Sequence, residues 1–121
     1  MKFINTTPHE IRLYGKNDDV LAIFPASNNP IRVDEVTSQI GNFPFYNDKD
    51  DTTEHISLVS KSYTAPTINF TLSHENKYIC SRVVKKAIQE HFPFISHFFI
   101  VPTDVIKDTS GYVYGCHTFS I

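Results

Sequence analysis

The chain has 121 residues, of which 40% are hydrophobic and 20% are charged, and its formal net charge is −2 at pH 7. This length fits one domain with a core of its own. The negative charge argues against general nucleic-acid binding, which depends on neutralising phosphates. The chain contains no run of 18 apolar residues, so we expect no membrane span.

The start of the chain and the two cysteines point to a reducing compartment. The first residues contain no apolar stretch of the kind found in secretory signals, so we expect a cytoplasmic protein. Cys80 and Cys116 are then expected to be free thiols, the usual state of cysteines in the cytosol.

Short strands are predicted for the first third of the chain. Phe3 and Ile4 begin a strand that ends near Pro8, because proline cannot donate to a ladder. Residues 11–14 and 20–24 flank a turn-forming segment, which predicts a hairpin. Segments 31–33 and 35–40 are also expected to be extended.

The middle of the chain is predicted to contain a polar insertion between strands. Residues 41–54 hold Gly41, Pro44 and a run of charged residues, which predicts a protruding loop. Residues 56–63 alternate as a strand does. Segments 68–72 and 77–80 are further strand candidates.

One main helix is predicted over residues 81–91, where apolar residues recur at helical spacing and Pro93 follows. Val84, Ala87 and Ile88 are expected to face a sheet. A buried strand at 98–101 and a terminal hairpin around 108–111 complete the pattern. The fold class predicted is α+β: a single strand-rich domain, residues 1–121, with an antiparallel or mixed sheet and this helix.

The junction at Ser81 and Arg82 is the most informative site candidate. A helix N-terminus presents unpaired N–H groups and a partial positive charge, so it can receive an anion, and Arg82 could close on the same anion. Serine is also a preferred N-cap, which would explain Ser81 without any ligand. Both interpretations stay open.

His9 and Arg32 are the other site candidates read from the residues. His9 follows Pro8 in an irregular segment, where it could bind a ligand, act as a base or fix the turn. Arg32 follows a loop rich in proline and asparagine and could also meet an anion. No metal-ligand spacing is present, so no metal or cofactor is expected. A general acid/base pair is not visible either, so no catalytic residue is predicted.

Further cations and aromatic residues could contribute to such a site. Arg12 and Lys61 are the remaining cations of interest, and a solvated outer face is the simpler interpretation of Arg12. Several aromatic side chains could stack on a base, although most should belong to the core; they are Tyr14, Phe24, Phe45, Tyr63 and Tyr112.

Several motifs, in order along the chain, resemble those of a family of small uncharacterised proteins of bacteriophages and bacteria. The matching segments are Asn5-Thr6-Thr7-Pro8-His9, Pro25-Ala26-Ser27, Arg32-Val33, Tyr78-Ile79-Cys80-Ser81, Val101-Pro102, Asp108 to Gly111, and Gly115-Cys116. The loop Ser27-Asn28-Asn29 departs from the family's Ser-Gly. The family supplies no activity, but the resemblance implies a phage-encoded accessory protein. Thr7, which lies in the first of these motifs, is also a candidate site residue.

These observations favour a non-enzymatic binding protein that captures a small anionic or nucleotide-like ligand. The candidate ligand-binding residues are Thr7, His9, Arg32, Ser81 and Arg82. By analogy with other phage accessory proteins, the ligand would be a nucleotide immune signal of the host, sequestered in the host cytoplasm. The alternatives are a small hydrolase or lyase with His9 as base, and a protein–protein inhibitor without a small ligand. A homo-oligomer is also expected as an option, since a small domain can build a deep pocket at a subunit boundary.

Overall fold

The computed structural model describes all 121 residues and divides the chain into two compact units. The larger unit, here called the body, comprises Met1–Val33 and Ala65–Ile121, and the smaller unit, the ribbon, comprises Asp34–Thr64. The sequence predicted one domain with a protruding polar segment, and the ribbon arises in that part of the chain.

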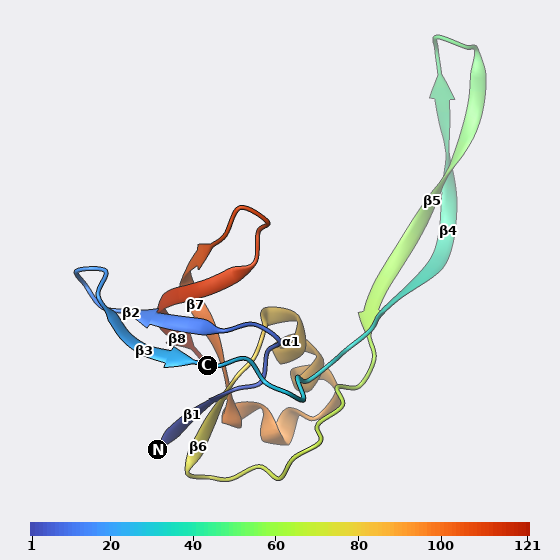
Figure 1. Ribbon diagram of the computed structural model, residues 1–121. Coiled ribbons are helices and arrows are strands. Elements are labelled where there is room, and N and C mark those ends of the chain that lie inside the picture. The colour runs from blue at the N-terminus through green and yellow to red at the C-terminus, as the bar shows by residue number, and fades with distance from the viewer. The chain divides into compact units, whose positions relative to one another are not determined.

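Six strands of the body form a mixed sheet in the spatial order β1-β6-β7-β8-β2-β3 (Figure 1). Parallel pairs are β1–β6, β6–β7 and β8–β2, and antiparallel pairs are β7–β8 and β2–β3. The expectation of a strand-rich α+β fold is thereby confirmed, and the sheet is mixed. The strands are β1 (Lys2–Asn5), β2 (Ile11–Tyr14), β3 (Val20–Phe24), β6 (Asn76–Ile79), β7 (Phe99–Lys107) and β8 (Val113–Ser120).

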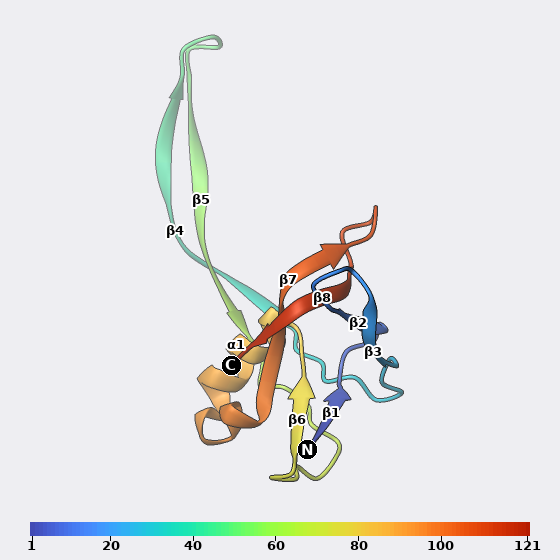
Figure 2. The same ribbon diagram turned by 90° about the vertical axis from the view of Figure 1, so that its left-hand side faces the viewer.

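The sheet curls so strongly that its first and last strands, β1 and β3, approach each other (Figure 2). The Asn5 side-chain amide donates to the carbonyl of Phe24 at 3.2 Å. The rings of Phe3 and Phe24 lie 6.2 Å apart, centroid to centroid. The curled sheet therefore has an inner face that is nearly enclosed by its own strands.

Helix α1 (Arg82–His91) joins the parallel strands β6 and β7, which need a crossover connection. Ser81 is its N-cap, and the Ser81 hydroxyl oxygen accepts the N–H of Val84 at 3.2 Å. Val84, Ala87 and Ile88 are buried, as predicted. A 3₁₀ turn, η1 (Pro93–Phe98), then leads into β7. The predicted helix is therefore confirmed, and the structural role of Ser81 with it.

Both faces of the central strands are buried because their side chains alternate between two clusters. Tyr78, Cys80 and Phe99 belong to the cluster that includes Val84 and Ile88 of α1. Ile79 and Ile100 lie in the second cluster with Ile11 and Cys116. Both cysteines are buried free thiols. Alternation thus explains why these strands read as continuous apolar runs.

The ribbon is a long two-stranded antiparallel hairpin of β4 (Glu35–Asn47) and β5 (Thr52–Tyr63). The loop predicted over residues 41–54 is therefore wrong except at its centre, since both flanks of the turn are strand. Pro44 is tolerated because β4 has a neighbour on one side only. Gly41 follows a register irregularity rather than ending the strand.

The strand candidate at residues 68–72 is also wrong. This segment forms no ladder, and its nearest pairing is the isolated bridge between Thr67 and Arg32. Ile68, Phe70 and Leu72 instead pack as partly buried side chains on the α1 cluster. Core packing alone therefore produced the strand-like alternation. None of the helices combines the length and hydrophobicity needed to cross a bilayer.

Candidate functional site

A cavity of about 710 Å³ lies in the body where three segments distant in sequence meet. They are the turn after β1, the start of α1 and the hairpin of β7 and β8. Small-molecule sites in proteins commonly have volumes of ~300–1,000 Å³. Apolar side chains form part of the wall, and the polar or aromatic ones are Thr7, His9, Ser81, Arg82, Lys107 and Tyr112.

The turn that carries Thr7 and His9 is held by the buried side chain of Asn5. The side-chain oxygen Oδ1 of Asn5 accepts hydrogen bonds from the backbone N–H of Thr7 at 2.9 Å and from the Thr7 hydroxyl at 2.7 Å. The Asn5 amide donates to the backbone carbonyl of His9 at 2.7 Å. Thr6 anchors the same turn, because its hydroxyl donates to the carbonyl of Ile79 at 2.7 Å. Side chains other than His9 therefore fix this turn, and the imidazole is left for another role.

The imidazole of His9 lies against the ring of Tyr112, with the two ring centroids 4.7 Å apart and the planes tilted by 41°. His9 comes from the N-terminal turn and Tyr112 from the tip of the β7–β8 hairpin. Two adjoining rings in the wall of a cavity offer aromatic faces on which a planar ligand can stack.

The cavity is also lined by two cations, one from the start of α1 and one from β7. Ser81 satisfies the N–H of Val84, while the N–H groups of Arg82 and Val83 have no intrahelical acceptor. The Arg82 side chain comes from this first turn, and Lys107 comes from the end of β7. No aspartate or glutamate lines the cavity. The cavity is therefore suited to an anion.

Cys80 lines the same cavity but is poorly suited to be a nucleophile. Burial raises the pKa of its thiol to about 12, an effect that the charge of Lys85 only partly offsets. The thiolate is the reactive form of cysteine. At neutral pH this thiol therefore stays protonated and acts as part of the apolar wall.

The structure brings four of the five predicted ligand-binding residues together around this cavity: Thr7, His9, Ser81 and Arg82. Arg32 is not among them. It lines a separate depression of about 210 Å³ beside Asn29 and Thr67. Its backbone forms the isolated bridge to Thr67, a contact between distant segments that the sequence alone does not reveal.

Lys107 is the cavity cation that sequence reasoning missed. It lies at the end of β7, two residues after Val105, so the two side chains share a face of the strand. That alternation could be predicted from the sequence. The approach of the hairpin to the N-terminal turn could not, because it depends on the parallel pairing of β2 with β8.

The other cations singled out in the sequence have acidic partners elsewhere. The Arg12 guanidinium pairs with Glu10 at 3.1 Å, and Lys61 pairs with Glu35 across the ribbon at 3.1 Å. Both pairs are exposed, so each contributes little to stability. Neither cation lines the cavity.

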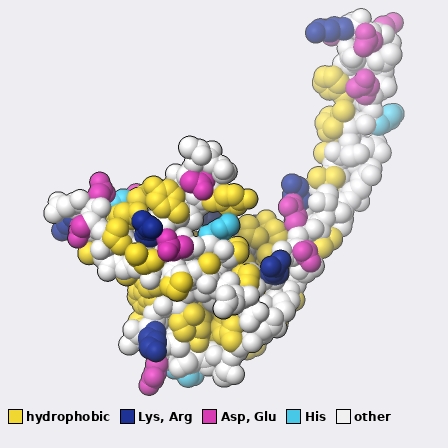
Figure 3. Space-filling view, viewed as in Figure 1, with side chains coloured by type: hydrophobic (Ala, Val, Ile, Leu, Met, Phe, Trp, Pro, Cys, Tyr) yellow, Lys and Arg dark blue, Asp and Glu magenta, His cyan; other side chains and the backbone are white.

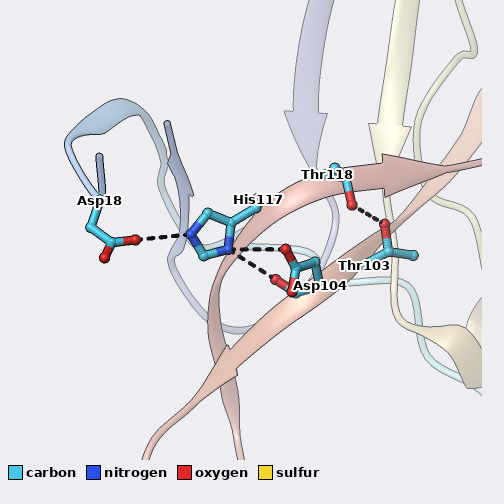
Figure 4. A network of polar contacts seen from close by, with 5 residues as sticks. All are labelled: Asp18, Thr103, Asp104, His117 and Thr118. Atoms are coloured by element: carbon cyan, nitrogen blue, oxygen red, sulfur yellow. Dashed lines mark hydrogen bonds and ion pairs between the residues drawn. The ribbon is translucent and has the colours of Figure 1, made fainter. Parts of the chain in front are cut away.

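A second polar cluster surrounds His117 on β8 (Figure 4). Its Nε2 lies 3.1 Å from the Asp18 carboxylate, and its Nδ1 lies 3.3 Å from the Asp104 backbone carbonyl and 3.5 Å from the Asp104 carboxylate. The bond to Asp18, followed by that to Asp104, raises the pKa of His117 above its ordinary value of 6.5. Asp18 and Asp104 both adopt left-handed backbone, with φ of 59° and 49°. His117 thus links the β2–β3 turn to β7.

The fold and the cavity define a small strand-rich α+β protein with a positively charged site and no acidic side chain in its wall. No family model, curated protein or solved structure matches the chain. The resemblance to small phage and bacterial proteins therefore stays a prediction from motifs. No group of three or more histidine, cysteine, aspartate or glutamate side chains is arranged to hold a metal ion.

Proposed function

We propose that this protein captures a small anionic, nucleotide-like ligand in the cavity of the body, without changing it chemically. The observation that carries the proposal is the meeting of Arg82 and Lys107, from α1 and β7, on one cavity that no carboxylate lines. Two cations without an acidic partner in the wall leave a positive charge that a ligand with about two negative charges would offset.

The two kinds of wall suit the two parts of a nucleotide. The start of α1 offers backbone N–H groups, the Ser81 hydroxyl and the Arg82 guanidinium to phosphate oxygens. The ring pair of His9 and Tyr112 offers a surface for a base. The ligand class that uses both walls is a phosphorylated compound with a planar ring.

Capture fits the site better than catalysis does. The Ser81 oxygen is engaged by the Val84 N–H, and His9 contacts Tyr112 rather than a hydroxyl nucleophile. A hydrolase with an activated serine would need the base within hydrogen-bond reach of that hydroxyl. A lyase or hydrolase with His9 as base acting directly on the ligand is the second candidate, since the His9 ring lines the cavity.

The biological setting is proposed from the motif resemblance. A phage-encoded protein that holds a nucleotide immune signal in the host cytoplasm would lower the free concentration of that signal without catalysis. A cavity with candidate contacts for both the phosphate and the base of a nucleotide supports such a role. Two other predictions about partners stand beside this proposal. The chain could form a homo-oligomer, or it could be a protein–protein inhibitor without a small ligand.

A release experiment separates capture from catalysis. The wild-type protein is incubated with a panel of linear and cyclic nucleotides, freed of unbound ligand and denatured, and the released compounds are identified by mass. We expect one class of nucleotide to be retained and released intact. His9→Ala should retain less nucleotide, because one contact to the ligand is lost. The nucleotide that it releases should still be intact.

Two results would overturn the proposal. A new product formed by the wild type and absent with His9→Ala would establish an enzyme. Failure to retain any nucleotide would favour a protein–protein role. Arg32→Ala serves as the matched control, because it removes a cation of the body outside the cavity.

A further inference from the structure

The ribbon has one apolar face and one mostly polar face. Side chains directly opposite each other in an antiparallel pair lie on the same side of the sheet. The register pairs Phe43 with Ile56, Gly41 with Leu58 and Phe45 with Glu54. This apolar face carries five large hydrophobic side chains, all half-exposed, and it also carries Ser38, Ser60, Ser62 and Glu54. The five hydrophobic residues are Val36, Phe43, Phe45, Ile56 and Leu58.

The opposite face of the ribbon is different in character. It carries Gln39, Asn42, His55 and Lys61, with Pro44, Tyr46 and Val59 among them. Apolar side chains are visible along the ribbon in Figure 3, where they interrupt the polar surface. A strand pair that concentrates its large apolar side chains on one side has the pattern of a sheet that buries that side.

Nothing within the ribbon buries this face. Every residue of β5 before Tyr63 is exposed, and the two strands have no third strand or helix in their own unit. An isolated two-stranded hairpin is at best marginally stable in water, and it gains stability when its hydrophobic face is packed. The partner that is always available to a chain is another copy of itself.

We propose that the apolar face of the ribbon packs against the same face of a second copy, with the two ribbons antiparallel across a two-fold axis near Leu58. The face is about 40 Å long, from the rise of a strand, and about 10 Å wide. Two such faces bury on the order of 1,000 Å² once side-chain relief is counted, the minimum for a specific interface.

The charges of the ribbon favour the antiparallel arrangement. The turn at its tip holds Asp48, Asp50 and Asp51 with Lys49, and Glu54 is the charged residue nearest to it on the apolar face. Parallel ribbons would bring two acidic tips together, which is unfavourable. Antiparallel ribbons separate the tips and place each Glu54 over the end of the partner face, where Ser62 can donate to it.

Gly41 leaves space at the centre of the face. A Cβ added there would meet no atom within 4 Å. The two Leu58 side chains that meet at the axis can lean into the space beside them, as large and small residues do in packed sheets. An axis at this point also sets Phe43 and Ile56 of one copy over the small side chains of Ser38 and Ser60 of the other. Large residues therefore meet small ones across the two-fold axis.

Matched charge substitutions on the two faces test the proposal by mass measurement in solution. Leu58 and Val59 are adjacent and similarly exposed, at 44% and 49%, but they lie on opposite faces. We expect the wild type to be a dimer by light scattering at about 50 μM. Leu58→Asp should raise the dimer dissociation constant at least ~100-fold, and Val59→Asp should change it less than ~3-fold.

A second pair of variants guards against unfolding of the ribbon. Gly41→Glu places a charge at the centre of the apolar face where the isolated chain has open space, and Asn42→Glu places the same charge on the other face. The first should give a monomer and the second a dimer. A monomeric wild type, or equal masses within either matched pair, would overturn the proposal.

Cross-linking identifies what covers the face. Cys80 and Cys116 are buried, so an introduced surface cysteine is the reactive thiol of the folded chain. A short bis-maleimide should link two chains of Leu58→Cys through that residue, and it should not link Val59→Cys. Linkage of Val59→Cys alone would overturn the arrangement, and so would a wild-type dimer in which Leu58→Cys does not link. These readouts do not depend on ligand capture, so the proposed function can fail while this proposal stands.

Discussion

The body and the ribbon are built by opposite means from one chain. The body buries apolar side chains on both faces of its central strands, with Ile79, Ala87, Ile88 and Phe99 fully inaccessible. The ribbon has a continuous ladder of paired strands but almost no buried side chain. Backbone pairing therefore gives the ribbon its form, and side-chain burial gives the body its stability. A region of the first kind needs a partner, while a region of the second kind can hold a preformed cavity.

A charge placed in the core of the body should have the largest effect on folding. Val84 is 7% exposed and Val83, beside it on α1, is 43% exposed. Val84→Asp should lower the free energy of unfolding by about 3–5 kcal/mol, because it buries an unpaired carboxylate. Val83→Asp, the control, should lower it by less than about 1 kcal/mol. Urea denaturation followed by circular dichroism measures both, and equal effects would contradict the assigned face of α1.

The cysteines sharpen the contrast because both lie in the body. Burial raises the pKa of Cys80 to about 12 and, together with the charge of Asp104, raises that of Cys116 to about 11. At pH 8 the thiolate of Cys80 should be on the order of a thousandfold rarer than that of an ordinary cysteine. A thiol reagent should therefore label neither cysteine quickly in the native protein and both after unfolding, without any reductant. Unfolded, unreduced protein with no free thiol would show a disulfide and contradict this.

The smallest effect is expected at the exposed cluster of His117. The folded pKa of His117 is raised, so its protonated form stabilises the fold. That contribution is fully present below the ordinary pKa of 6.5 and is lost as the pH rises through the raised folded value. The melting temperature of the wild type should fall across this window relative to that of His117→Gln. Parallel pH profiles of the two proteins would show that His117 does not link the β2–β3 turn to β7.

Local patterns made the helix and the terminal hairpin predictable. The spacing of Val84, Ala87 and Ile88 with a capping serine defined α1, and its observed start and end differ little from the predicted ones. The turn around residues 108–111 likewise joins β7 and β8 as expected. These features depend on interactions between residues close in sequence, which composition and periodicity record.

Features set by distant contacts were not predictable in the same way. Pro44 and Gly41 read as breakers, although a strand with one neighbour tolerates both. Residues 68–72 alternate because they pack on the α1 cluster, not because they form a ladder. Lys107 joins the cavity through the pairing of strands far apart in the chain, and Arg32 lines a separate depression beside Thr67.

The most direct test of ligand capture by the body compares cavity cations with a cation outside the cavity. Calorimetric titration would use the nucleotide that the release experiment retains, and its dephosphorylated nucleoside as a second ligand. Arg82→Ala and Lys107→Ala should each weaken nucleotide binding by about 1.5–3 kcal/mol, the range for a hydrogen bond to a charged group. Arg32→Ala should leave the affinity unchanged, and the nucleoside should bind the wild type more weakly than the nucleotide. Equal losses in all three variants, or equal affinity for nucleotide and nucleoside, would contradict an anion site formed by Arg82 and Lys107.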